Sequence, residues 1–219
     1  MKLEETEEYK KYKLEREEKM KSIKSGENVF HLSYFGGMIT EIDLLEYEKS
    51  IKDIGFEFSS YDKNGDFYAS LDSFTLDVCF ILSQITVQGI ISNTINSATW
   101  DSIKYVVLNI WNKVKNKEIN KGNSSGFTKK TISFGIKASL DKNTNFDFNL
   151  SGDLSEKMVL ESLDKTLEII KSQKTHSEYK HPTFVTYDKK KGKWKSMDVD
   201  EEMRKIALKQ IKKQKKNKK

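Results

Sequence analysis

Apolar residues recur every three or four positions in three stretches of the chain, which is the spacing of a helix with one buried side. These stretches predict helices over residues 40–55, 100–117 and 153–170. Thr40, with Asp43 three residues later, has the residue types of a capping box and supports the start of the first helix. We therefore expect amphipathic helices that pack against a sheet.

Other segments alternate apolar with polar residues and are rich in β-branched and aromatic side chains, which predicts strands. Asn64-Gly65 separates two of them and favours a tight hairpin turn. The sequence DKNTN separates another pair and predicts a second hairpin. The predicted strands are residues 28–37, 56–61, 66–71, 131–140, 146–150, 183–187 and 193–197.

The order of these elements predicts an α+β fold. Because tight turns separate neighbouring strands, we expect a mainly antiparallel sheet with helices on one face. The first elements follow the β-α-β-β-α-β order of a ferredoxin-like core, and residues 121–126, KGNSSG, are expected to form a flexible loop. The expected domains are a charged helical extension over 1–27, a core over 28–175, and a hairpin, amphipathic helix and polybasic tail over 176–219.

Residues 3–24 have the pattern of a charged helix with too few apolar residues for a place in the core. Several pairs, such as Glu7 and Lys11, are four residues apart in the order that stabilises a helix. This helix is either a solvated extension or a segment that docks onto a partner protein.

Residues 78–100 contain no charged side chain, in a chain where 33% of residues are charged. Many of them are Ser, Thr, Asn, Gln or Gly, and polar side chains in a bilayer need hydrogen-bond partners, so no membrane span is expected. We expect the buried centre of the fold, with small residues that suit close helix packing or a subunit contact. QITVQGII, residues 84–91, fits either a helix or a strand.

The composition excludes several kinds of site. Cys79 is the only cysteine, which excludes an intramolecular disulfide and a cysteine-rich zinc site, and its apolar surroundings favour a buried thiol. His31, His176 and His181 have no ligand at a metal-binding spacing. The sequence has no nucleophile elbow, no phosphate-binding loop and no dinucleotide-binding glycine pattern. We therefore expect no catalytic residue, no cofactor and no metal.

Two further patterns are incomplete. Residues 62–73 and 141–152 begin like calcium-binding loops, but both lack the glycine at the sixth position and the glutamate at the twelfth. Glu178 and Lys180, with Asp164 upstream, have the spacing of a metal-dependent nuclease. That nuclease is the less favoured alternative, because the expected elements place Asp164 on a helix and the other two in a linker.

The positive charge of the chain is concentrated at its end. Nine basic and no acidic residues lie over 204–219, and removing these nine charges from the net charge of +6 leaves −3 over residues 1–203. A polybasic segment binds nucleic acid through counterion release, without dependence on base sequence. Only Arg16 and Arg204 supply the guanidinium fork that reads guanine, so base-specific recognition is disfavoured.

Nucleic-acid binding is thus the second functional prediction. Trp194 lies between two lysines and could stack on an exposed base. The alternative is that the tail only solubilises the chain. The predicted nucleic-acid-binding residues are Lys189, Lys190, Lys191, Lys193, Trp194, Lys195, Arg204, Lys205, Lys209, Lys212, Lys213, Lys215 and Lys216.

The central block, residues 28–172, combines DLLEYEKSIKDIGFEF, the uncharged segment with the basic helix end that follows it, and TISFGIKASLDKNTNFDFNL with its following helix. In this order of elements it resembles the effector-associated adaptor domains of bacterial conflict and anti-phage systems. The resemblance implies an adaptor that contacts an effector or sensor protein. Together with the missing catalytic motifs and the missing apolar stretch at residues 1–13, it predicts a cytoplasmic, non-catalytic interaction subunit of a multi-protein assembly.

Overall fold

The computed structural model describes residues 6–64, 76–123, 126–141, 143–172 and 183–198, and the pairs 201–202, 204–205 and 207–208. Five helices and nine strands are formed within these residues. In chain order they are α1 (Glu7–Lys21), β1 (Val29–Tyr34), α2 (Glu41–Lys52), β2 (Glu57–Asp62), β3 (Val78–Ile81), α3 (Gln84–Ile91), α4 (Ser97–Val114), β4 (Glu118–Asn123), β5 (Gly126–Thr131), β6 (Phe134–Asp141), β7 (Thr144–Leu150), α5 (Glu156–Ser172), β8 (Thr183–Asp188) and β9 (Lys193–Met197).

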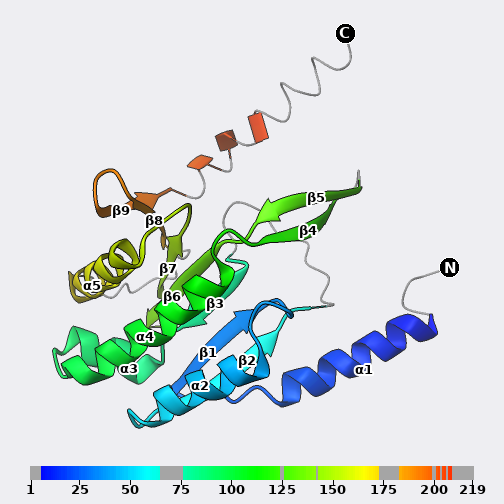
Figure 1. Cartoon of the computed structure of the whole chain (residues 1–219), viewed down its shortest axis with the longest axis horizontal. Coiled ribbons are helices and arrows are strands. Elements are labelled where there is room, and N and C mark those ends of the chain that lie inside the picture. Colours follow the sequence, from blue (N-terminus) through cyan, green and yellow to red (C-terminus); the bar gives the residue numbers. More distant parts are fainter. Residues whose placement is uncertain are drawn as a thin grey trace.

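Seven strands form one sheet in the order β2-β1-β3-β6-β7-β8-β9, and β4 pairs only with β5 (Figure 1). The pairs β1–β2, β3–β6 and β7–β8 are parallel. The pairs β1–β3, β6–β7 and β8–β9 are antiparallel. The fold is therefore α+β with a mixed sheet.

A mainly antiparallel sheet with a ferredoxin-like core is not confirmed, because half of the neighbouring pairs in the sheet are parallel. The cause lies in the helices. Helix α2 follows β1 and carries the chain back, so that β2 lies beside β1 in the same direction, and α5 does the same for β7 and β8. The order of elements along the chain does not reveal this pairing. It is the same whether a helix places the next strand beside the preceding strand or farther along the sheet.

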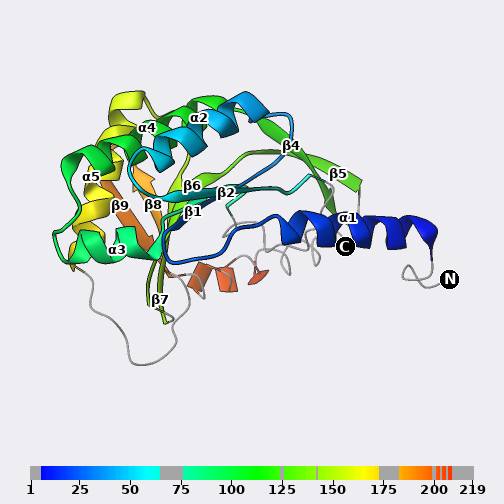
Figure 2. The same ribbon diagram turned by 90° about the horizontal axis from the view of Figure 1, so that it is seen from below.

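The helices α2, α4 and α5 lie over one face of the sheet (Figure 2). The strands direct most of their large apolar side chains to this face, and four phenylalanines at its centre have no exposed surface. They are Phe30, Phe80, Phe134 and Phe148, from β1, β3, β6 and β7. Because strand side chains alternate between faces, the polar residues of the same strands lie on the opposite face.

The uncharged segment 78–100 forms β3, α3 and the start of α4. QITVQGII is a helix, and Ser83 caps it by accepting a hydrogen bond from the Thr86 backbone N–H at 3.1 Å. Only part of this segment is buried, since Val87 and Ile90 are in the core while Ile85 is 45% exposed. No described helix combines the length and the apolar character needed to cross a bilayer.

The elements predicted from periodicity are confirmed where the structure describes them, including the hairpins β6–β7 and β8–β9. Residues 66–71, the second strand of the hairpin expected at Asn64-Gly65, lie outside the described residues. Residues 121–123 and 126, expected in a flexible loop over 121–126, belong instead to the strands of the hairpin β4–β5, and residues 124–125 lie outside the described residues. The sequence there lacks the apolar alternation of a core strand, because this hairpin does not join the main sheet.

Gly135 and Gly89 provide a matched test of the packing. A Cβ atom at Gly135 would lie 2.4 Å from the Phe148 carbonyl oxygen and 2.7 Å from a Leu76 methyl, whereas at Gly89 the nearest atom would be at 3.5 Å. We expect Gly135→Ala to lower the unfolding free energy by about 3 kcal/mol. Gly89→Ala, within α3, should raise it by up to about 1 kcal/mol, because alanine favours the helix.

Urea denaturation of both variants measures these changes. Equal effects of the two substitutions would contradict the close approach of β7 to Gly135.

Candidate functional site

The outer edge of β2 is an edge of the sheet at which no described strand is paired. Glu57 donates its backbone N–H to the Asn28 carbonyl at 3.1 Å, and Lys63 donates to the Tyr34 carbonyl at 2.7 Å. These bonds and the parallel register fix the alternation of the strand. The odd-numbered residues from 57 to 63 are bonded to β1, and the backbone groups of Phe58, Ser60 and Asp62 therefore point away from the sheet.

A groove of about 410 Å³ lies at this edge, between α2 and the segment that joins α1 to β1. Its floor is the middle of β2, residues 58–60. Leu44 and Leu45 of α2 form an apolar wall, and Ser22 and Lys24 form the opposite wall. The groove therefore combines apolar side chains with a strand edge that no other described strand occupies.

Helix α2 is held firmly enough to form a wall. The Thr40 hydroxyl accepts the Asp43 backbone N–H at 3.2 Å, and the Asp43 carboxylate accepts the Thr40 backbone N–H at 2.9 Å. Lys113 of α4 lies 2.9 Å from the same carboxylate. Burial alone would raise the pKa of Asp43, but the hydrogen bonds from Thr40 and Lys113 outweigh it and lower the pKa. Tyr47 and Ile51 anchor the buried side of the helix.

The opposite wall is tied to both β2 and α2. The Lys24 backbone N–H donates to the Ser59 hydroxyl at 3.1 Å, and its ammonium group lies 3.5 Å from Glu48. Lys52 also pairs with Glu48 at 2.9 Å, and its hydrogen bond, helped by Lys24, lowers the pKa of Glu48. Glu41 lines the groove too, and it forms no ion pair with a described residue. One carboxylate of the groove is thus available to a cation.

Two apolar side chains extend the groove onto the surface. Ile42 is 76% exposed and Leu45 is 65% exposed, both on α2. Neither residue belongs to the buried helical stripe of Leu44, Tyr47 and Ile51. Sequence reasoning missed them, although a second leucine directly after Leu44 lies off the buried stripe and was a usable signal.

Some of the predicted nucleic-acid-binding lysines lie within the described residues. Lys189, Lys190 and Lys191 are exposed in the β8–β9 turn, and Lys193 and Lys195 are exposed on β9. The turn is ordered by Asp188, whose carboxylate accepts the Lys190 and Lys191 backbone N–H groups.

The remaining predicted lysines and the arginine lie near the end of the chain. Arg204 and Lys205 are exposed, and Lys205 pairs with Glu201 and Glu202 at 2.8 Å each. The others lie outside the described residues: Lys209, Lys212, Lys213, Lys215 and Lys216.

Trp194 is part of the packing between β9 and α5. Its indole N–H donates to the Ser162 carbonyl of α5 at 2.9 Å, and its ring packs edge to face with Phe148 and Tyr187 at 5.3 Å. The side chain therefore joins β9 to α5 across the core. This packing gives no support to the prediction that Trp194 stacks on a nucleic-acid base.

The other candidate groups have structural partners. Asp164 accepts hydrogen bonds from the Trp100 indole and from Lys104, both at 3.2 Å, which links α4 to α5. Burial raises the pKa of Cys79 to about 12, so its thiol stays protonated. Burial lowers the pKa of the half-buried His31.

The other predicted positions are His176, His181 and the Glu178–Lys180 pair, and they lie outside the described residues. Among the described residues, no three His, Cys, Asp or Glu side chains are grouped as a metal site would need.

On the sheet face away from the helices, Lys137 and Asp147 form an ion pair at 3.4 Å, with the Asp147 side chain only 9% exposed. Burial raises the pKa of Asp147 and outweighs the opposite effect of Lys137. The folded chain thus binds this proton more tightly than the unfolded chain. The stability from Asp147 is complete below its ordinary pKa and is lost as pH rises through the folded pKa.

We expect Asp147→Asn, which cannot titrate, to have a higher unfolding free energy than the wild type at about pH 7. The difference should shrink as pH falls toward about 4. Urea denaturation across this range measures it. A variant that is less stable than the wild type at neutral pH would show that the ion pair, and not burial, dominates.

Comparison with protein-family models, with curated proteins and with solved structures gives no match to this chain. The geometry of the groove at β2 is therefore the observation from which a function can be inferred.

Proposed function

We propose that this chain is a cytoplasmic, non-catalytic interaction subunit that binds an extended segment of a partner protein at the outer edge of β2. The observation that carries the proposal is the groove in which the outward backbone groups of Phe58, Ser60 and Asp62 adjoin the apolar wall of α2. An extended peptide can add to such an edge as a further strand, with main-chain hydrogen bonds for affinity and side-chain pockets for specificity.

The two edges of the sheet support the choice of β2. Exposed sheet edges invite pairing, and proteins commonly block them with lysine or proline. The strand at the other edge, β9, carries Lys193 and Lys195. Strand β2 contains no lysine and no proline over residues 57–62. Among the described residues, the edge at β2 is thus the one suitable for strand addition.

The walls indicate the chemistry of the partner segment. Leu44 and Leu45 favour an apolar side chain that enters the groove, and the exposed Ile42 extends the apolar contact. Glu41 favours a lysine or arginine near that side chain. The partner is therefore an extended segment that combines apolar residues at alternate positions with a basic residue.

The broader role follows the resemblance of residues 28–172 to effector-associated adaptor domains. In this proposal the groove couples the chain to an effector or sensor within a bacterial defence assembly. Binding of nucleic acid through the polybasic tail is the alternative function, and the exposed lysines of the β8–β9 turn are compatible with it.

Selection from a random peptide library on the full-length chain tests the proposal. We expect enrichment of segments with alternating apolar residues and a basic residue. Ser60→Pro removes one outward N–H and leaves the bonds to β1 intact, and Leu45→Arg places a cation in the apolar wall. Each should weaken binding of a selected peptide about tenfold or more, measured by fluorescence anisotropy.

Leu14→Arg is the matched control, because Leu14 of α1 is 62% exposed and lies outside the groove. This variant should bind the peptide as the wild type does. Selected peptides that bind Ser60→Pro and Leu45→Arg at full strength would contradict strand addition at β2.

A further inference from the structure

The hairpin β4–β5 forms an arm outside the main sheet, defined here as residues 118–123 and 126–131. Its strands pair with each other from Glu118–Thr131 to Asn123–Gly126. In both Figure 1 and Figure 2 the arm extends away from the layer of helices and the seven-stranded sheet. A two-stranded hairpin has little stability on its own, so its base must be held by the body of the molecule.

A buried polar cluster holds that base. The Asp77 carboxylate accepts the Ser133 backbone N–H at 2.8 Å and the Ser133 hydroxyl at 2.7 Å, and it pairs with Lys130 at 2.9 Å. The side chain of Asp77 is only 10% exposed. The Ile132 backbone N–H donates to the Lys117 carbonyl at 2.9 Å and closes the hairpin at its base. The direction of the arm relative to β3 is therefore fixed.

The arm and its base are strongly basic. Residues 113–131 contain six lysines and one acidic residue, Glu118, whereas residues 1–64 contain 15 acidic and 11 basic residues. Two of the six lysines, Lys113 and Lys130, are used in ion pairs with buried carboxylates.

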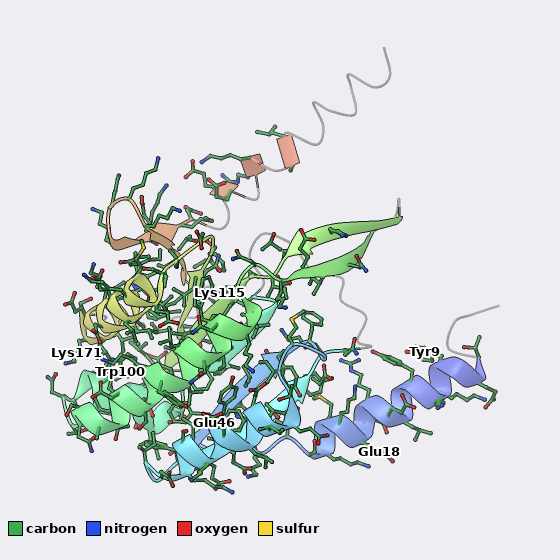
Figure 3. All side chains as sticks on the ribbon, viewed as in Figure 1. Tyr9, Glu18, Glu46, Trp100, Lys115 and Lys171 are labelled. Carbon is green, nitrogen blue, oxygen red and sulfur yellow. The ribbon has the colours of Figure 1, made fainter. Side chains whose placement is uncertain are left out.

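Three lysines around the base of the arm form no ion pair with a described buried carboxylate. Lys115, which Figure 3 labels at the end of α4, and Lys117 form no ion pair with a described residue. Lys129 is 76% exposed and lies 3.8 Å from the exposed Glu118, a contact that contributes little.

We propose that this arm binds the phosphate backbone of duplex nucleic acid. A two-stranded ribbon fits the major groove, which places lysines at its base near the flanking phosphates. Lysine contacts phosphate as a point charge and reads no base sequence, so the binding is sequence-tolerant and sensitive to salt.

An acidic protein surface fits the arm less well. Protein interfaces have an apolar centre, but the large apolar residues of the arm are only Ile119 and Phe127, and Ile119 packs against the core of this chain. The arm also shares no residue with the tail over 204–219 or with the groove at β2. The proposal therefore stands independently of peptide binding.

The test compares full-length variants in fluorescence anisotropy with DNA and RNA duplexes of about 20 base pairs, between about 50 and 200 mM salt. Replacing Lys115, Lys117 and Lys129 together by Gln should weaken binding about tenfold or more at about 100 mM salt. It should also reduce the slope of log affinity against log salt by about 3, because each lost phosphate contact removes about one unit. The duplex for which this loss is larger identifies the natural class.

The matched control replaces the exposed Lys11, Lys13 and Lys21 of α1 by Gln, which removes the same charge elsewhere. It should leave affinity and slope close to the wild type. Equal losses in both triple variants, or an arm variant that binds duplex at full strength, would overturn the proposal. Anionic vesicles that bind the wild type more tightly than either duplex, with loss in the arm variant, would overturn it in favour of a membrane surface.

Discussion

Burial of the aromatic and aliphatic residues of the sheet under α2, α4 and α5 is the interaction on which the other features depend. The large core lies on one face, so most central strands alternate a large apolar residue with a polar or small one, while Ile81 of β3 joins a smaller apolar cluster on the opposite face. Each helix must lie against this face to bury its own apolar stripe. Helix α2 does so beside β1 and β2, and the position of α2 in turn creates the wall of the groove at the sheet edge.

The groove shows how one helix serves both packing and recognition. Tyr47 and Ile51 of α2 are buried, and a capping box with an ion pair to α4 fixes the start of the helix. The same helix turns Leu44 and Leu45 toward the open edge of β2. A partner strand placed there would meet a wall that is already ordered, which reduces the entropy lost on binding. The basic arm follows the same logic, since the cluster around Asp77 fixes its base.

Local patterns in the sequence were sufficient to predict most of the helices and strands. The Thr40–Asp43 capping box and the alternation around Phe134 and Phe148 each predict an element that the structure contains. Residues 84–91 were ambiguous, because β-branched residues also occur on a short capped helix, and Ser83 resolves the choice in favour of α3. The β4–β5 hairpin was missed because a ribbon outside the core has no apolar alternation to detect.

The pairing of strands and the candidate site could not be read from the sequence. The groove joins residues 22–24, 41–48 and 58–60, and they meet only because β2 lies parallel to β1 at the edge of the sheet. No local pattern encodes that adjacency. Trp194 is a further example, since it lies between two lysines in the sequence, while the alternation of β9 directs its side chain toward α5.

Residue-resolved amide hydrogen exchange along β2 tests the open edge most directly. In the isolated chain, the odd-numbered amides of Glu57, Ser59 and Tyr61 should exchange slowly, because they are bonded to β1, and those of Phe58, Ser60 and Asp62 should exchange quickly. Adding a bound peptide should slow the second set and leave the first unchanged. Slow exchange of Phe58 and Ser60 in the isolated chain would show that the edge is already occupied and would contradict a free binding site at β2.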